Sequence, residues 1–494
     1  MKDKGLHISY FHEWKFSIMK QVEEKIEKIK SKFTKNKINS ILDDKSIQKH
    51  LKKLHTNFVT VPTDKAQNNV SIICKQFYAD VLLQEIRKST YENSTEEKTN
   101  VIEKHVNDLS KWNLKVDEES KNIPRMYWTP KIHKTPIGTR FIIGNPRSTL
   151  KPLTKDITQF CKRFLEALTL YYNKVDYMSG TKHLWITQNN NQFIEFMDRT
   201  NRKGKAKSIS TYDFSSLYTH IPHDQLITVL SELVDFVFQG GTRTYISVTK
   251  SGANFVQKQN RKKTCYTKES IKEAIIYIME NCYFTIGNMT FRQIIGIPMG
   301  SDPAPFFANF FLSHFEAKYI SQLRKRDPKL ARKFKNICRY IDDLVAPNDD
   351  NAFHNSFLEI YPAELTLNKE NEFNTAATFL DLNIEIIDNK FVTKIFDKRD
   401  SYEFDIVRLP HKSSNIPYKM FYNTLGAEFL RVCRATSNYQ PFKSSSISLI
   451  RRVKRQGGCV KGIESLLKKT INKHWLTFSK FEVNQTIMIK DILL

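Results

Sequence analysis

Three aspartates are the residues of this 494-residue chain whose type and spacing point most clearly to chemistry. Asp342 and Asp343 are adjacent and stand between two short apolar runs, a pattern typical of a hairpin with acidic residues at its tip. Neighbouring carboxylates repel each other, so a folded site keeps both ionised when a cation neutralises them, most naturally a divalent metal with hard oxygen ligands. The third, Asp213, follows a β-compatible run and precedes a turn bounded by Pro222.

Three carboxylates from two strands can hold two Mg²⁺ ions roughly 3.5–4 Å apart, the geometry that supports in-line phosphoryl transfer. An acidic pair by itself is weak evidence, because Asp43-Asp44 and Asp349-Asp350 also occur here without such flanks. The alternative for Asp342-Asp343 is a solvated surface turn. The β-compatible segment around Asp213 favours the metal site over that alternative.

The elements that must position these aspartates are predicted from about Lys207 onward. There the apolar pattern indicates strand, helix, helix, strand and strand, which together make an antiparallel sheet backed by helices. Helices are predicted over three ranges: 226–238, 270–281 and 303–319. The last carries a phenylalanine stripe typical of core packing. A hairpin with a Gly-Asn turn is predicted over 283–292, and the polar, basic segment 241–263 is predicted to be an exposed insertion.

The rest of the chain gives coarser patterns. Residues 1–56 are basic with apolar positions at three- and four-residue steps, which predicts one or two amphipathic helices that pack one face. These positions are Val22, Ile26, Ile29 and Phe33. Residues 57–155 mix short extended runs with Pro and Gly, and the polar stretch 90–121 is predicted to contain a helix. Beyond Asp397 the chain is predicted to be helical.

Composition favours a nucleic-acid partner. The chain has 78 Lys and Arg against 52 Asp and Glu, a net charge of +26, and such a surplus attracts a polyanion. Solubility with a lysine-rich coding bias is the alternative, but basic residues cluster near short motifs of the chain and in the tail, as at 261–263 and 451–455.

No membrane or disulfide framework is expected. No apolar run reaches the roughly 18–20 residues that span a bilayer, and the N-terminus lacks the apolar region of a signal peptide. Seven cysteines without a Cys-x-x-Cys pair suit reduced thiols better than disulfides or a zinc site. We therefore expect a soluble, intracellular protein in the cytosol or the nucleus, and of the two the nucleus is favoured.

Several short motifs follow one another along the chain. They are VPTDK at 61–65, TPKIHK at 129–134, GTRFI at 138–142, the segment around Asp213, GIPMGS at 296–301, YIDD at 340–343, LTLNKE at 365–370, TFLDL at 378–382 and HKSSNIP at 411–417. Their order resembles that of reverse transcriptases, and in detail that of the polymerase of Penelope-like retroelements, which is related to telomerase reverse transcriptase. Each motif is weak singly, and the collinear set is strong.

The resemblance implies an α+β right-hand polymerase fold with fingers, a palm made of an antiparallel sheet backed by helices, and a helical thumb. It implies four regions: a basic helical N-terminal extension at 1–56, a fingers-like region with a nucleotide-contacting hairpin at 57–206, the reverse transcriptase palm at 207–396, and a helical basic thumb with the C-terminal tail at 397–494. We find no GIY-YIG endonuclease motif, so the 3′-hydroxyl primer is expected to come from elsewhere.

The activity implied is that of an RNA-directed DNA polymerase, a nucleotidyltransferase that extends a DNA primer on an RNA template with deoxynucleoside triphosphates and two Mg²⁺ or Mn²⁺ ions. An RNA–DNA hybrid is therefore an expected partner. The resemblance makes Asp213, Asp342 and Asp343 the catalytic metal ligands. It makes Lys369 a proton donor to the departing pyrophosphate, with a salt bridge to Glu370 or Glu372 as the alternative.

The same resemblance assigns nucleotide contacts. Lys131 and Arg140 belong to a hairpin over the triphosphate, where His133 and Lys134 could substitute. Tyr218 stands where the family places an aromatic that excludes a 2′-hydroxyl, with a buried core tyrosine as the alternative. The other expected nucleotide contacts are Phe214, Met299 and Gly300, and Met299 stands where many reverse transcriptases carry Gln. The expected nucleic-acid contacts are Lys65, Lys134, Arg431, Arg434, Arg451 and Arg452.

Two other functions stay open. A reverse transcriptase of the telomerase, group II intron or retron type would share the palm. A catalytically silent nucleic-acid-binding remnant would share the charge, but the three intact aspartates argue against decay.

Overall fold

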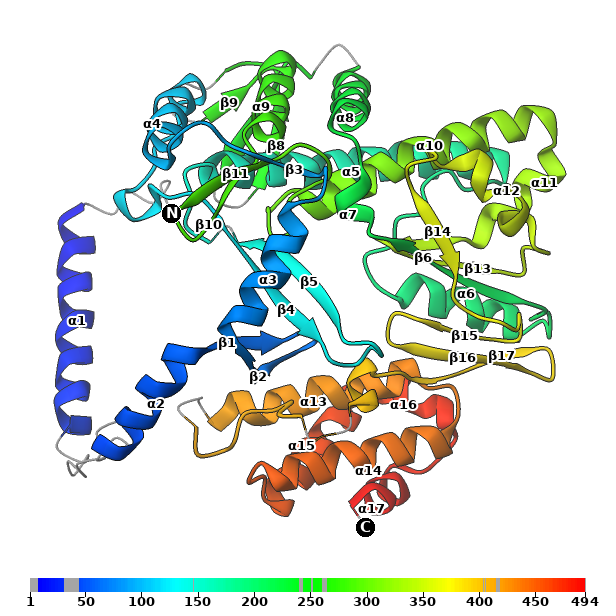
Figure 1. The fold of residues 1–494 in the computed structure, drawn as a ribbon. Coiled ribbons are helices and arrows are strands. Elements are labelled where there is room, and N and C mark those ends of the chain that lie inside the picture. Colours follow the sequence, from blue (N-terminus) through cyan, green and yellow to red (C-terminus); the bar gives the residue numbers. More distant parts are fainter. Residues whose placement is uncertain are drawn as a thin grey trace. The chain divides into compact units, whose positions relative to one another are not determined.

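The structure, a computed structural model, describes residues 8–30, 44–144, 146–239, 243–249, 252–259, 264–402, 404, 406–414 and 418–493 (Figure 1). Two compact units are present, one of Met1–Thr60 with Ile72–Gln76 and one of Val61–Ser71 with Phe77–Leu494. The search for membrane spans, made over the described residues, finds no helix with the length and apolar character to cross a bilayer.

The smaller unit contains helices α1 (Ile8–Lys30) and α2 (Lys45–Asn57). Asp44 caps α2, because its side chain accepts hydrogen bonds from the amides of Ser46 and Ile47. The two helices agree with the sequence prediction. The prediction that each buries one apolar face is wrong for the described residues. Within this unit α2 buries no residue, and the side chains of α1 from His12 to Glu27 are exposed. Phe33 lies outside the described residues.

The described strands form five sheets. Their orders are β1-β2, β3-β11-β10-β4-β5, β12-β13-β6-β14, β15-β16-β17 and β8-β7-β9. The strand bounds are β1 Phe58–Thr63, β2 Ala66–Cys74, β3 Tyr91–Asn93, β4 Arg125–Lys131, β5 Gly138–Gly144, β6 Ile209–Ser215, β7 Tyr245–Thr249, β8 Gly252–Val256, β9 Thr264–Tyr266, β10 Tyr283–Ile286, β11 Met289–Gln293, β12 Cys338–Tyr340, β13 Asp343–Pro347, β14 Thr366–Lys369, β15 Ala376–Phe379, β16 Leu382–Ile387 and β17 Lys390–Ile395.

The helices of the larger unit lie between these strands and after them (Figure 1). Their bounds are α3 Lys75–Ile86, α4 Lys98–Asp108, α5 Lys151–Ser179, α6 Asn191–Asn201, α7 Leu217–His220, α8 His223–Phe238, α9 Lys268–Glu280, α10 Ala304–Arg326, α11 Pro328–Lys333, α12 Ala352–Ile360, α13 Tyr418–Ala435, α14 Tyr439–Arg455, α15 Val460–Lys473, α16 Trp475–Phe478 and α17 Gln485–Leu493.

The central sheet β12-β13-β6-β14 is antiparallel throughout and is backed by helices on one face. Tyr212 of β6, for example, packs its ring edge-on against Phe353 of α12, with ring centroids 4.8 Å apart. Helices α13, α14, α15 and α17 share a second core that includes Phe429, Phe442 and Leu467. The predicted α+β architecture, an antiparallel sheet backed by helices with helices after it in the chain, is therefore confirmed.

The predicted helices are present, and α10 is more deeply buried than predicted. The phenylalanine stripe predicted one packing face, but residues on several faces of α10 are buried, among them Phe307, Phe310, Leu312 and Tyr319. A helix that is apolar all round belongs in the centre of a core. The long helix α5, with buried residues at helical spacing from Leu153 to Leu168, was not predicted.

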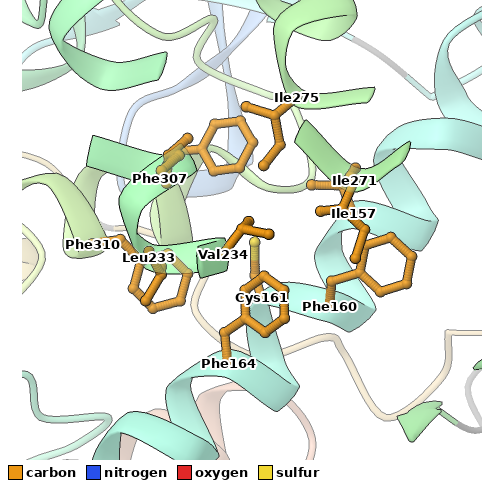
Figure 2. Close-up of a pocket in the computed structure, with 11 residues that line it drawn as sticks. Ile157, Phe160, Cys161, Phe164, Leu233, Val234, Ile271, Ile275, Phe307 and Phe310 are labelled. Carbon is orange, nitrogen blue, oxygen red and sulfur yellow. The ribbon is translucent and has the colours of Figure 1, made fainter. Parts of the chain in front are cut away.

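Figure 2 shows the place where α5, α8, α9 and α10 meet. The side chains around it are all apolar, including Cys161, Val234, Ile271 and Phe307, and they enclose a cavity of about 10 Å³. That volume is about one water molecule, and no polar partner lines it. This cavity is therefore part of the core and not a ligand site.

The predicted exposed insertion at 241–263 is wrong. Its described residues form most of the small sheet β8-β7-β9, in which Ile246 and Ser247 are buried. Apolar and polar residues alternate from Ile246 to Thr249 in β7, and this period of two was hidden by the polar composition around it. The basic cluster 261–263 lies outside the described residues, as do 415–417 at the end of the HKSSNIP motif.

Candidate active site

The central sheet brings the three aspartates together. Asp343 at the start of β13 stands directly opposite Asp213 on β6, and the amide of Phe214 donates to the carbonyl of Asp342 over 3.3 Å. One carboxylate oxygen from each of Asp213, Asp342 and Asp343 lies within 4.8 Å of the others. Residues 129 positions apart in the sequence thus form one cluster because the hairpin β12–β13 pairs with β6.

The electrostatics of this cluster favour a bound cation. Burial raises the pKa of Asp213 to about 6, and the charges of Asp342 and Glu370 act in the same direction. Burial also raises the pKa of Asp343 to about 6, again assisted by Asp342. Both shifts express the cost of ionising carboxylates that lie together, away from water. A divalent cation would remove that cost, and three carboxylates are the donor set that Mg²⁺ and Mn²⁺ prefer.

Two charged residues near the cluster were not predicted as part of it. The pKa of Asp213 is raised first by burial, next by the charge of Asp342 and then by that of Glu370. The charge of Lys398 lowers it. Glu370 follows β14, and its amide donates to the carbonyl of Thr211. The only signal for Glu370 was its place in the LTLNKE motif. Lys398 begins a 3₁₀ turn between the TFLDL and HKSSNIP motifs and belongs to neither, so no signal existed for it.

Lys369 is not brought to the cluster. In β14 it pairs with Tyr212, whereas Asn368 pairs with Asp213. Directly opposed residues of an antiparallel sheet share a face, so Lys369 lies on the helix-covered face and Asp213 on the other. The Lys369 ammonium donates to Asn374 Oδ1 over 2.7 Å.

The hairpin β4–β5 places several cations near the carboxylates. Burial lowers the pKa of Lys131, as do the charges of Arg140 and Lys134, while Asp64 and Asp213 raise it. Arg140 stands opposite Thr129 in the hairpin, and its Nη1 lies 3.3 Å from Asp64 Oδ1.

Lys65 belongs to the same group of cations, since the charge of Arg140 acts on it. Its backbone is in the left-handed conformation, with φ of 60°. Burial lowers the pKa of Lys65 most, and the charge of Lys398 lowers it further. Asp343 is among the groups that raise this pKa. Asp64 just before it is buried, and its Oδ2 has no hydrogen-bond partner. A buried carboxylate beside Arg140 and Lys65 holds their charges in place.

The predicted nucleotide-contacting residues fall into two groups. Phe214 is buried and packs edge-on against Tyr361, so we assign it a packing role. Tyr218 lies on α7, where burial raises its pKa and the charge of Asp342 adds to the effect, which places the ring near the carboxylates. Both open alternatives, core packing and nucleotide contact, are compatible with a partly buried ring that packs on the core.

Met299 and Gly300 lie in a loop that is tied to β5. The amide of Ile143 donates to the Met299 carbonyl over 2.8 Å. Gly300 has φ of 115°, and a Cβ there would approach the Ile143 carbonyl to 2.6 Å. This contact requires glycine, because both the space and the backbone conformation exclude other residues.

The predicted thumb cations differ in their ion pairs and in their exposure to solvent. Arg431 on α13 is committed to intramolecular ion pairs, with Asp381 at 2.9 Å and Glu428 at 2.8 Å. Arg434 on α13 and Arg451 on α14 are exposed. Arg452 lines a cavity of about 210 Å³ together with Asp400, Arg431 and other residues.

No protein-family model and no curated protein matches this sequence. Solved structures match its fold. Telomerase from Candida albicans in complex with a TWJ fragment of telomeric RNA matches with a TM-score of 0.60 and 13% identity, covering 90% of this chain and 72% of that chain. Apo telomerase from Candida tropicalis matches with a TM-score of 0.47 and 12% identity, covering 89% and 70%.

The RNA-dependent RNA polymerase of a human picobirnavirus matches with a TM-score of 0.38 and 12% identity, covering 99% of this chain and 90% of that chain. The Candida albicans match shows that the chain has a polymerase fold of the reverse-transcriptase type. At this identity the likeness defines the fold alone, and the aspartate cluster adds the chemistry.

Proposed function

We propose that this chain is an RNA-directed DNA polymerase of a Penelope-like retroelement, which extends a 3′-hydroxyl primer with deoxynucleoside triphosphates. The observation that carries the proposal is the meeting of Asp213, Asp342 and Asp343 on one sheet of a polymerase fold. The collinear motifs support the Penelope-like assignment. The net charge of +26 supports RNA, DNA and hybrid partners, because phosphate contacts depend on such a surplus.

In this proposal the four regions have separate roles. Residues 207–396 form the palm, which holds the carboxylates. Residues 57–206 serve as fingers, whose hairpin β4–β5 covers the nucleotide, and residues 397–494 serve as a thumb that holds the hybrid. Residues 1–56 form a basic extension.

The three aspartates would hold two Mg²⁺ or Mn²⁺ ions. When bound, such ions activate the primer 3′-hydroxyl and stabilise the leaving pyrophosphate. Lys131 and Arg140 neutralise the triphosphate, and Asp64 keeps the guanidinium of Arg140 oriented toward it. Because Lys369 lies on the other face of the sheet, we assign it no proton transfer.

Tyr218 excludes a 2′-hydroxyl beneath the incoming sugar, and the backbone at Met299 and Gly300 approaches the new base pair. Lys65, Lys134, Arg434, Arg451 and Arg452 contact phosphates of the primer and template. Arg431 orients α13 instead, because its charge is already paired.

Primer extension by the full chain on poly(rA) with an oligo(dT) primer and Mg²⁺ tests the proposal. Asp342→Asn and Asp213→Asn remove a charged ligand each and are expected to lower the rate at least a thousandfold with the fold intact. Asp350→Asn is the matched control, because Asp350 belongs to an Asp-Asp pair outside the cluster and is exposed. Extension by either ligand variant at the parental rate, or none by the parent, contradicts the proposal.

A telomerase-type reverse transcriptase is the second candidate, and the TM-score of 0.60 to the Candida albicans telomerase favours it. A heteropolymeric RNA with an annealed DNA primer distinguishes the two. Copying to the end of any such template supports the retroelement polymerase. Repeated copying of a short segment of one RNA, with no use of other templates, supports the second candidate.

A further inference from the structure

A buried ion pair lies beneath the hairpin that carries Asp342 and Asp343. Arg339 on β12 and Glu316 on α10 have fully buried side chains, with Nε 2.5 Å from Oε1 and Nη2 3.2 Å from Oε2. The free-energy cost of removing two charges from water generally cancels the gain from their attraction. An apolar pair of similar volume can therefore stabilise a fold equally well. Stability alone therefore does not explain why these two charges are buried here.

The guanidinium of Arg339 has acceptors for all of its N–H groups. Its Nη2 also donates to the carbonyl of Asn309 and to Ser313 Oγ, each over 3.2 Å. Its Nη1 donates to Asn309 Oδ1 over 2.7 Å and to the carbonyl of Ile341 over 2.9 Å. The last bond reaches the turn of the hairpin, one residue before Asp342.

Ile341 is the residue of this turn that needs support. Its φ is 58°, in the left-handed region, which is strained for a β-branched side chain. Such a conformation persists only where the surroundings determine it. The bond from Arg339 to the Ile341 carbonyl restrains this turn together with the pairing of Tyr340 and Asp343, and it lies directly before Asp342.

Glu316 extends the same support toward the other metal-binding strand. Its Oε1 also accepts a hydrogen bond from the Tyr361 hydroxyl over 2.9 Å. The Tyr361 ring packs edge-on against Phe214, with centroids 4.9 Å apart, and Phe214 directly follows Asp213. One buried ion pair is thus linked to the backbone next to Asp342 and to the side chain next to Asp213.

We propose that Arg339 and Glu316 are positioning residues that fix the spacing of Asp342 and Asp213 for cation binding. The inference rests on the proposed function, because it assumes the cation site. Neither residue touches the cluster of carboxylates, so their effect passes through Ile341 and through Tyr361. Residues of this kind typically change metal affinity by roughly 10–100-fold when they are replaced.

The test is Mn²⁺ binding to the full chain without nucleotide, measured by electron paramagnetic resonance. The double variant Arg339→Met with Glu316→Leu removes both charges and leaves neither one unpaired. We expect its Mn²⁺ dissociation constant to rise roughly 10–100-fold with the fold intact by circular dichroism. In primer extension, the half-saturating Mn²⁺ concentration should rise by a similar factor, while saturating Mn²⁺ restores most of kcat.

Ser313→Ala is the matched control. It removes one acceptor of Arg339 Nη2 but leaves the bonds to Glu316 and Ile341, so Mn²⁺ affinity should stay at the parental value. If the double variant does not fold, Arg339→Lys replaces it, because one ammonium keeps the charge beside Glu316 but cannot also hold the Ile341 carbonyl.

Parental Mn²⁺ affinity in the folded double variant, or in Arg339→Lys where that variant is used, overturns the positioning role. A parent that binds Mn²⁺ but extends no primer overturns the proposed polymerase and leaves the positioning role standing. A parent that binds no Mn²⁺ overturns the positioning role, and it overturns the proposed polymerase as well when it also extends no primer.

Discussion

At the scale of single residues, the candidate site is dominated by charges that are unfavourable until a cation arrives. Asp213 and Asp343 each have a pKa raised to about 6 by burial and then by Asp342. The fold therefore stores repulsion at the place where metal binding would relieve it. This is the usual relation between a perturbed titration and a functional site.

One consequence is that the metal-free protein should gain free energy of unfolding when a metal-ligating carboxylate is replaced by an amide. Because the folded pKa of Asp213 is above its ordinary value of 3.8, the folded state binds this proton more tightly than the unfolded state. The contribution of Asp213 to the stability of the metal-free parent therefore falls as pH rises from about 4 to about 6 and stays lower above. Asp213→Asn cannot ionise, so at pH 7.5 it should be more stable by on the order of 1 kcal/mol, a value reduced for solvent screening.

Urea unfolding in EDTA at pH 7.5 and pH 4.5 measures this difference, which should shrink at the lower pH. Added Mg²⁺ should stabilise the parent by mass action and the variant much less. A variant that is less stable than the parent at pH 7.5 in EDTA would contradict the electrostatic account of the cluster.

Tyr218 gives a second prediction at this scale. Tyr218→Val opens space beneath the sugar and should raise ribonucleotide incorporation relative to deoxyribonucleotide by at least tenfold, because a steric penalty against the 2′-hydroxyl disappears. The ratio of the two kcat/KM values is the measurement. Tyr218→Phe keeps the ring and should keep the parental ratio. An unchanged ratio in a folded Tyr218→Val places the ring in the core.

At the scale of elements, the loop from Gly296 to Gly300 connects the parts of the site. Gly296 has φ of 88°, and a Cβ there would come within 2.4 Å of the Tyr218 carbonyl. Its amide also donates to the carbonyl of Ile221. The loop can thus lie against α7 only with glycine at this position.

Gly296→Ala should therefore lower stability by more than the left-handed backbone alone explains. Gly287 in the β10–β11 turn has φ of 58° with open space around its Cβ position, so Gly287→Ala measures the backbone term, about 1–2 kcal/mol. We expect Gly296→Ala to exceed Gly287→Ala by at least 1 kcal/mol in urea unfolding. It should also raise KM for nucleotide, because Tyr218 must move. Equal losses in the two variants would show that the loop yields without strain.

At the scale of the whole molecule, the net charge of +26 predicts hybrid binding that weakens steeply with salt. The structure indicates which of the positively charged side chains are available to bind phosphate and so contribute to this salt dependence. Arg434 is exposed, whereas both Asp381 and Glu428 pair with Arg431. Only a cation that exchanges counterions for phosphate adds to the salt dependence.

Arg434→Gln should reduce the slope of log Kd against log salt for an RNA–DNA hybrid by about 1. Arg431→Gln is the matched change in the same helix and should leave the slope nearly unchanged. Fluorescence anisotropy over a salt series measures both. A larger change of slope for Arg431→Gln than for Arg434→Gln would show that Arg431 leaves its ion pairs on binding nucleic acid.

The sequence by itself determined the fold class, the helices α8 and α9, the hairpin β10–β11 and the three aspartates. Each of these is encoded locally, by helical spacing, by a turn dipeptide or by short motifs. The interpretation of segment 241–263 failed, because its polar composition masked the alternation in β7. Helix α5 was missed although its buried positions recur at helical spacing.

Only the tertiary structure decided which residues share a face. Lys369 and Asp213 belong to adjacent paired strands, and the register places their side chains on opposite sides of the sheet. Glu370 and Lys398 act on the carboxylates, while Arg431 and Phe214 are committed to intramolecular partners. Pairing register and long-range packing decide these matters, and neither is written in the spacing of residues along one segment.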